Sequence, residues 1–282
     1  MTTAARPATL EKVAKTFKRK ERIIVIGVLN VTPDSFSDDG QFDSVDQAVR
    51  RCLQMVAEGA DIIDIGGESS RPGAVPVTEQ EELRRVMPVI EKVVESCSVP
   101  ISIDTCKAVV AEAALHAGAA IVNDISGLEN DPDLAPVVAR SNAGLVVMHK
   151  RGTSQTMQND THYDDLIGEI ISYLDNAVAM AERAGVDPDK IIIDPGIGFG
   201  KDVTGNLELI KSIDGFCQLG KPVLVGASRK SFIGRITGAA VNDRLPGSLA
   251  AAAIAVIYGA AAVRAHDVAA TRQAVDLAIR LR

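Results

Sequence analysis

Several features that define large protein classes are missing from this chain, beginning with paired cysteines. The four cysteines, Cys52, Cys97, Cys106 and Cys217, form no CxxC motif and have no histidine beside them. A disulfide framework or a zinc site would need such pairing. The sequence therefore predicts reduced thiols, mostly buried, as in a cytoplasmic protein.

The chain also lacks a long apolar run and an excess of basic residues. No apolar segment approaches the roughly 20 residues that span a bilayer. The N-terminus, MTTAARPATLEKVAKTFKRKER, is basic but has no apolar core of a secretory signal; it could be a short hairpin, a helix or a frayed tail. A formal net charge of −7 argues against nucleic-acid binding through a basic face. We expect no nucleic-acid or membrane partner, although a local cationic pocket could still hold a small anion.

Two segments resemble known ligand-binding loop motifs but do not match them. The segment IIIDPGIGFGKD places glycines at 196, 198 and 200, which is GxGxG spacing and not the GxGxxG dinucleotide pattern. The aspartates of VTPDSFSDDG resemble a calcium loop, but Phe36 occupies a ligand position and no glutamate stands twelfth. We therefore interpret the first segment as a strand-end acid, Asp194, followed by a tight loop, and reject an EF-hand for the second.

What the chain does contain is a repeated pattern of apolar run, polar end and amphipathic stretch. Eight such runs occur: IIVIGVLN, DIIDIGGE, PISIDT, AAIVND, AGLVVMH, KIIIDPG, KPVLVGAS and AAVRAH. Uninterrupted apolar strands indicate burial on both faces, as in a parallel sheet covered by helices. Eight strand–helix units in 282 residues predict a single α/β domain, a (β/α)8 TIM barrel. A doubly wound open sheet is the alternative, although five to seven strands would be usual for it.

The stretches between these runs predict helices, and no linker divides the chain. Helices are expected over residues 45–58, 79–95, 109–117, 163–184 and 268–281, the fourth having about six turns. Glycines 59, 118, 185 and 220 would end helices in the left-handed conformation. The small apolar stretch 247–262 could be core or a helix-packing interface. We expect residues 1–20 to be an N-terminal extension and residues 21–282 to form the barrel.

Polar residues stand where each predicted strand ends. In a barrel these ends meet at one rim, where barrel enzymes keep their chemistry. Carboxylates and amides suit the hydrogen-bonding edge of a flat heterocycle, and cations after the last two strands suit an anion such as phosphate. The flexible loops over residues 30–40 and 67–82 have the composition of lids. The rim residues are Asn30, Glu68, Asp104, Asn123, His149, Asp194, Ser228, Arg229, Lys230, Arg264 and His266.

Nine motifs in this order resemble the dihydropteroate synthases of folate biosynthesis. They are LNVTPDSFSDDG, GGESSRPGA, SIDT, IVNDISG, VVMHKRGT, DPGIGFGK, LVGASRKSFIG, RLPGSLAAA and VRAHDV. The resemblance covers the chain from Ile24 to its C-terminus. It implies a homodimeric (β/α)8 barrel with Mg²⁺ as cofactor, a transferase that condenses 6-hydroxymethyl-7,8-dihydropterin diphosphate with p-aminobenzoate and releases diphosphate. Sulfonamides inhibit such enzymes.

The resemblance also implies roles for particular residues. Asp104, Asn123, Met148, Asp194 and Lys230 would hold the pterin. Asn30, Ser70, Arg71, Arg264 and His266 would hold the diphosphate, with Asn30 and Asp38 as ligands of Mg²⁺. Phe36, Ser70, Pro72, Phe199, Lys230 and Ser231 would form the p-aminobenzoate pocket, where a helix starting near Ser231 could offer backbone N–H groups to the carboxylate. Asp104, Lys230, Arg264 and His266 would be the catalytic set.

Two positions depart from the family pattern, and two rival interpretations stay open. Ser70 stands where many members carry threonine, which removes a methyl group near the substrates, and Ser154 replaces a common proline. One rival is the methyltetrahydrofolate-binding barrel of corrinoid methyltransferases, which shares the pterin grip but handles no diphosphate. The other is a barrel that binds a pterin or a protein without catalysis. The SRKSFIG segment and the Arg264 and His266 pair favour the synthase.

Overall fold

The structure is a computed structural model that describes residue 16 and residues 22–31 and 41–282. Its strands are β1 (Ile24–Asn30), β2 (Ile62–Gly66), β3 (Ile101–Asp104), β4 (Ile121–Asp124), β5 (Gly144–Met148), β6 (Ile191–Asp194), β7 (Leu224–Val225) and β8 (Ala262–Ala265). The extension expected over residues 1–20 lies, apart from Thr16, outside the described residues. The eight predicted strands are all present.

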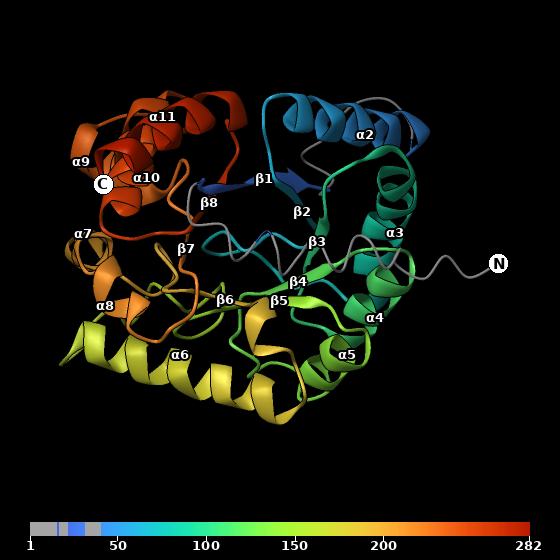
Figure 1. Ribbon diagram of the computed structural model, residues 1–282, viewed down its shortest axis with the longest axis horizontal. Coiled ribbons are helices and arrows are strands. Elements are labelled where there is room, and N and C mark those ends of the chain that lie inside the picture. Colours follow the sequence, from blue (N-terminus) through green and yellow to red (C-terminus); the bar gives the residue numbers. More distant parts are fainter. Residues whose placement is uncertain (1–15, 17–21, 32–40) are drawn as a thin grey trace.

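The strands form one parallel sheet that closes on itself, as Figure 1 shows in its central ring of strands. The order is β6-β5-β4-β3-β2-β1-β8-β7. A parallel bridge between Ile193 and Val223 joins β6 to β7, and the Ile193 amide donates to the Pro222 carbonyl oxygen over 3.0 Å. The predicted (β/α)8 barrel is confirmed, and the open sheet is excluded. β7 is only two residues long, because the chain turns at Gly226 into the loop that carries Lys230.

Helices surround the barrel (Figure 1). They are α2 (Gln41–Ala57), α3 (Glu79–Ser96), α4 (Ala108–His116), α5 (Leu134–Arg140), α6 (Leu166–Arg183), α7 (Val203–Lys211), α8 (Ile213–Cys217), α9 (Ser231–Thr237), α10 (Leu245–Ile257) and α11 (Val268–Leu281), with short 3-10 turns at Pro188–Lys190 and Val241–Asp243. Within the described part of the chain, none of them is both long and apolar enough to cross a membrane. Four of the five predicted helices are present within a few residues of their expected bounds, and the helix-ending glycines 59, 118, 185 and 220 have positive φ as predicted.

The helix expected over residues 163–184 is shorter than predicted at its start. α6 begins at Leu166 and not at residue 163, because the Asp165 carboxylate accepts the Gly168 amide over 3.0 Å and caps the helix. Its 18 residues make about five turns and not six. Tyr163 instead packs back on the barrel rim, where its hydroxyl donates to the Gly200 carbonyl oxygen over 3.0 Å.

The core has two parts. Apolar side chains on the outward faces of the strands pack against the helices, and an inner cluster that includes Ile26, Ile62, Ile121 and Val146 fills the barrel. The four cysteines are free, as expected, but only Cys52 is fully buried; the expectation that most are buried is wrong, because the other three lie at helix ends or beside helix starts. Because aliphatic side chains fill the inside of the barrel, polar groups gather at the carboxyl ends of its strands.

Candidate active site

The strands bring most of the predicted site residues to one end of the barrel. Asn30, Asp104, Met148 and Asp194 are the last residues of β1, β3, β5 and β6, and Asn123 and Arg264 are next to last in β4 and β8. Lys230 precedes α9, Ser231 is its first residue, and His266 follows β8 directly. Ser70, Arg71 and Pro72 lie in the loop after β2, and Phe199 lies in the loop after β6. Phe36 and Asp38 fall in residues 32–40, outside the described residues.

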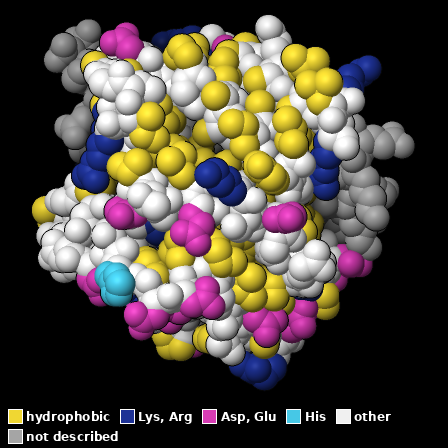
Figure 2. Space-filling view, turned by 90° about the vertical axis from the view of Figure 1, so that its left-hand side faces the viewer, with side chains coloured by type: hydrophobic (Ala, Val, Ile, Leu, Met, Phe, Trp, Pro, Cys, Tyr) yellow, Lys and Arg dark blue, Asp and Glu magenta, His cyan; other side chains and the backbone are white. Residues whose placement is uncertain are grey.

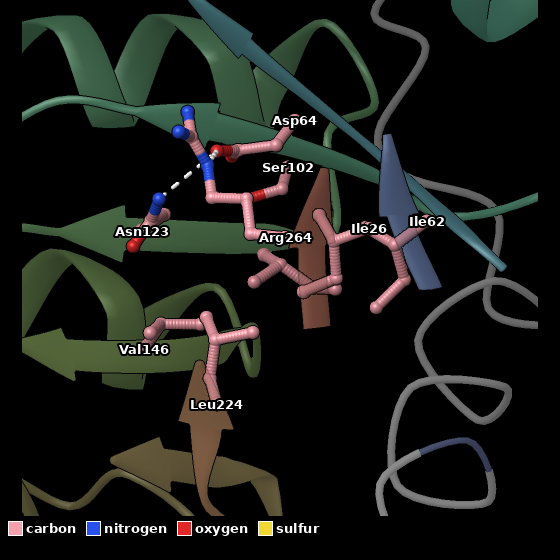
Figure 3. A pocket seen from close by; sticks show the side chains of 9 residues that line it. Ile26, Ile62, Asp64, Ser102, Asn123, Val146, Leu224 and Arg264 are labelled. Atoms are coloured by element: carbon pink, nitrogen blue, oxygen red, sulfur yellow. Dashed lines mark hydrogen bonds and ion pairs between the residues drawn. The ribbon is translucent and has the colours of Figure 1, made fainter. Parts of the chain in front are cut away.

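A carboxylate for which the sequence predicted no role links these residues. Asp64 lies in the middle of β2 and is 1% exposed. Its Oδ2 accepts hydrogen bonds from Asn123 Nδ2 over 2.9 Å and from Arg264 Nε over 2.7 Å, as Figure 3 shows. A terminal nitrogen of Arg264, Nη2, donates to Asp104 Oδ2 over 2.8 Å. Arg264 is thus held inside the barrel by two acids. The signal for Asp64 was present in the sequence as one charge inside the apolar run IIDIG.

The space beside Gly226 joins this group to the other half of the site. A Cβ placed on Gly226 would lie 3.8 Å from Arg264 Cβ, 4.0 Å from Asp194 Oδ2 and 4.0 Å from Lys230 Nζ. The Asp194 carboxylate, the Lys230 ammonium and the Arg264 side chain therefore converge around one backbone position that has no side chain. Through Arg264, and through Asp64 in the case of Asn123, the structure brings Asp104, Asn123, Asp194 and Lys230 together.

Burial changes the charge state of these groups. Desolvation raises the pKa of Asp104 to about 7, although Arg264 opposes the shift. It also raises the pKa of Asp194, against the opposing effect of Lys230. The pKa of Lys230 falls to about 8, again mainly because burial disfavours the charge. Near neutral pH the site thus holds one acid, Asp104, and one cation, Lys230, that can change protonation, which is typical of functional sites.

The predicted anion-binding pair, Arg264 and His266, contacts different partners. His266 Nδ1 lies 3.0 Å from the Ser228 hydroxyl, and the Ser228 oxygen also accepts the His266 amide over 3.2 Å. Burial lowers the pKa of His266 to about 4, with nearby Arg264 adding to the shift. His266 is therefore neutral at pH 7 and offers a hydrogen bond, while Arg264 keeps its charge because the two aspartates outweigh the effect of burial and raise its pKa.

Apolar groups form one wall of the site. Met148, Met157 and Phe199 are buried together, and Ile125 packs against them. The Lys230 ammonium nitrogen lies 4.3 Å from the centre of the Phe199 ring. A flat ring that rests on this wall would have its edge next to the carboxylates.

The loop after β2 is fixed at its base. Lys107 Nζ donates to Glu68 Oε2 and to Glu82 Oε2, each over 2.5 Å, and Glu68 also accepts the Val77 amide over 3.3 Å. Near its tip, the Gly73 amide donates to the Ser154 carbonyl oxygen over 2.8 Å. Between these anchors Ser70 is partly exposed, and Arg71 and Pro72 are exposed, so that all three are accessible to a ligand.

Metal ligands are sparse at this rim. Within the ranges that the structure describes, no three His, Cys, Asp or Glu side chains lie together as a metal-binding group. Asn30, at the end of β1, supplies one amide oxygen. This donor suits Mg²⁺, which takes oxygen ligands and is commonly held by one or two protein groups together with substrate phosphates.

Comparison with known proteins decides the family. The sequence profile described as "Pterin binding enzyme" matches residues 26–266. The dihydropteroate synthase of Bacillus subtilis is 47% identical over 249 residues, which cover 88% of this chain and 85% of that protein. The chain belongs to the pterin-binding enzyme family, among the dihydropteroate synthases.

Solved structures agree with this assignment. Dihydropteroate synthase from Clostridium difficile, crystallised in the presence of pteroic acid, is 42% identical, with a TM-score of 0.89 over 94% of this chain and 98% of that one. The Yersinia pestis enzyme in complex with a sulfonamide drug is 40% identical, with a TM-score of 0.88 over 94% and 96%. The resemblance expected from the motifs is confirmed, and both rival interpretations are set aside. The activity is that of a transferase of folate biosynthesis.

Proposed function

We propose that this chain joins 6-hydroxymethyl-7,8-dihydropterin diphosphate to p-aminobenzoate at the carboxyl end of its barrel, where separate groups of residues hold the two substrates. The observation that carries these roles is the convergence of Asp194, Lys230 and Arg264 around Gly226. Two cations and one acid thus surround a space that is open because Gly226 has no side chain.

The pterin would lie in this space. Asp104, Asn123 and Asp194 supply oxygen and amide groups for the ring edge, where a carboxylate can pair with a ring N–H and an amino group together. Met148 belongs to the apolar wall against which the ring would stack. Lys230, between Asp194 and Phe199, would contact the ring and border the pocket of the second substrate.

The diphosphate would lie above the pterin, among Asn30, Ser70, Arg71, Arg264 and His266. Arg71 lies on the exposed part of the β2 loop, where an anion can reach its side chain. Asn30 and Asp38 would hold Mg²⁺, which, when bound, offsets charge on the diphosphate oxygens. Arg264 and the neutral His266 would contribute a charge and a hydrogen bond to the same leaving group.

The second pocket would take p-aminobenzoate. Phe36, Ser70, Pro72, Phe199, Lys230 and Ser231 would line it, at the start of α9. The enzyme from Xanthomonas albilineans, 44% identical with a TM-score of 0.86 over 93% of each chain, was solved with 4-aminobenzoic acid. Together with the Yersinia pestis sulfonamide complex, it supports binding of both p-aminobenzoate and sulfonamides here.

Catalysis would depend on position and charge, since the described site contains no side chain placed as a covalent nucleophile. The C–O bond between the pterin methylene and diphosphate breaks first, and the bonding electrons leave with the diphosphate. Asp104, close to the electron-rich ring, helps to stabilise the resulting positive charge. The aryl amine then attacks the methylene carbon and loses a proton, after the loops have excluded water.

Incubation of the purified protein with pterin diphosphate, labelled p-aminobenzoate and Mg²⁺ tests the function. Labelled dihydropteroate is expected, and its absence would reject the proposal. Omitting p-aminobenzoate tests the order of steps: release of diphosphate without the amine supports early bond breaking, while complete dependence on the amine contradicts it.

The enzyme would act as a homodimer in the cytoplasm. Four free cysteines fit a reducing compartment. Figure 2 views the side where α7, α9 and α10 lie, and hydrophobic side chains gather on its upper half. Ile254, Ile257 and Tyr258 of α10 and its end, with Leu277 and Leu281 of α11, are at least 40% exposed. We call these five residues the α10/α11 patch; an exposed apolar surface of this kind favours association.

A further inference from the structure

A buried lysine that the reaction scheme does not use lies directly behind the site. Lys201, in the loop after β6, is 2% exposed. Its ammonium nitrogen contacts four acceptors: the carbonyl oxygens of Pro195 and Gly196, both at 2.9 Å, and the Nδ1 and carbonyl oxygen of His149, at 2.8 and 3.3 Å. These acceptors are three carbonyl oxygens and one imidazole nitrogen, so none of them is a carboxylate.

One peptide group connects this lysine to the pterin site. The Pro195 carbonyl oxygen that accepts from Lys201 and the Gly196 N–H belong to the same peptide unit. That N–H donates to Asp194 Oδ1 over 2.7 Å. Burial lowers the pKa of Lys201, but only the ammonium form has three N–H groups for the three carbonyl oxygens around its nitrogen. The cation thus lies at the oxygen end of the peptide dipole, and the Asp194 carboxylate lies at its N–H end. A cation at the oxygen end polarises the N–H and strengthens its bond to the carboxylate.

The surrounding backbone leaves this peptide little freedom. Gly196 has φ +73°, and a Cβ there would overlap the His149 carbonyl oxygen. The His149 amide donates to the Asp194 carbonyl oxygen over 3.0 Å. Lys201 therefore ties the ends of β5 and β6 together at the point where Asp194 projects into the site.

We propose that Lys201 is a positioning residue for the pterin substrate. It fixes the peptide between Pro195 and Gly196, and this peptide in turn sets the orientation and charge of the Asp194 carboxylate that binds the pterin. The inference rests on the assignment of Asp194 as a pterin ligand. Besides Lys201, the charged groups that act on Asp194 are Lys230 and Arg264, which both favour its ionised form while burial opposes it.

The chain provides a matched control at the opposite end of the same strand. Lys190, just before β6, is 6% exposed, and its Nζ donates to the Asn142 carbonyl oxygen over 2.9 Å and to Asn142 Oδ1 over 2.7 Å. It is a buried lysine with neutral acceptors, as Lys201 is, but it has no connection to Asp194. Lys201→Met and Lys190→Met remove the same ammonium group at similar burial.

The test compares pterin diphosphate binding by calorimetry, both KM values, and the thermal midpoint of the two variants. We expect Lys201→Met to weaken pterin diphosphate binding about 10-fold or more, the range for losing a hydrogen bond to a charged group. The KM for p-aminobenzoate should change less than about twofold. The acid limb of kcat/KM should also move to higher pH, because Asp194 loses a supporting cation. Lys190→Met should lower the thermal midpoint without either change.

Lys201→Gln keeps donors for the carbonyl groups but removes the charge, and we expect it to bind pterin diphosphate with intermediate affinity. If Lys201→Met does not fold, the Gln variant carries the same comparison. Equal effects of Lys201→Met and Lys190→Met on pterin affinity, or no effect of either, would overturn the proposal. Because binding is measured without turnover, this result is independent of whether the wild-type chain forms dihydropteroate.

Discussion

Among single residues, Lys230 gives the site its clearest dependence on pH. Its pKa is lowered to about 8, so the ammonium group is charged below this pH and neutral above it. If the charged form binds the substrates, kcat/KM for pterin diphosphate should be highest below pH 8 and fall as the pH rises through that value. Steady-state kinetics across the alkaline range measure this limb.

Lys230→Arg is the control for this assignment. An arginine at this position stays charged throughout the accessible range, so the limb should disappear even if the absolute rate falls. A wild-type profile that stays flat up to about pH 10 would contradict a role for the Lys230 charge.

A second prediction for a single residue concerns Gly226. A methyl group there would lie 3.8–4.0 Å from atoms of Arg264, Asp194 and Lys230, which are ordinary contact distances, so the folded protein should tolerate Gly226→Ala. The same methyl would occupy the space assigned to the pterin. We expect the thermal midpoint to change little and the KM for pterin diphosphate to rise about 10-fold or more.

Gly215→Ala in α8, where an added Cβ meets nothing within 4 Å, is the matched control and should leave both quantities unchanged. Wild-type affinity in the Gly226→Ala variant would mean that the pterin lies elsewhere.

The sequence predicted which polar residues lie at the carboxyl ends of the strands better than it predicted their hydrogen-bond partners. The strand ends Asp104, Asn123 and Asp194 could be found because each closes an apolar run. Asp64 could not be assigned in this way, because it lies inside a strand, and its side chain reaches Arg264 only after 200 residues of chain have closed the barrel. The sequence likewise contains no signal for the peptide that connects Lys201 to Asp194.

At the scale of elements, Lys107 joins three parts of the barrel wall. It precedes α4 and binds Glu68 after β2 and Glu82 in α3, whose side chain is 1% exposed. Removing the ammonium group would leave the Glu82 charge buried without its cation, which is strongly destabilising. We expect Lys107→Met to lower the free energy of unfolding by about 3 kcal/mol in denaturant titrations.

A double variant separates charge from packing in this prediction. Glu82→Gln removes the isolated charge, so Lys107→Met with Glu82→Gln should be more stable than Lys107→Met alone. A double variant as unstable as the sum of the two single variants would show that the ion pair does not account for the loss.

At the scale of the whole molecule, the fold could be predicted because strand periodicity and strand number are both local signals. Eight apolar runs with polar ends favour a closed parallel barrel over an open sheet, and the bridge from Ile193 to Val223 closes it. Two details differ from the prediction. α6 starts late because Asp165 caps it, which is a local contact, and β7 is short because its chain turns at Gly226 into the site.

The α10/α11 patch is the surface through which we expect two chains to form the proposed homodimer. The C-terminal ends of α10 and α11 adjoin, since a Cβ on Gly259 would lie 3.8 Å from Arg282 Nη2, and Leu277 is 62% exposed near this junction. Leu277→Glu would place a charge in the α10/α11 patch, so light scattering should find twice the 29.7 kDa chain mass for the wild type and a single chain mass for the variant. Val109→Glu, at an exposed valine on α4, is the control and should stay dimeric. Because the described site residues all come from one barrel, the Leu277→Glu monomer should retain its activity per chain; a monomeric wild type, or a variant that remains dimeric, would contradict the assignment of this surface.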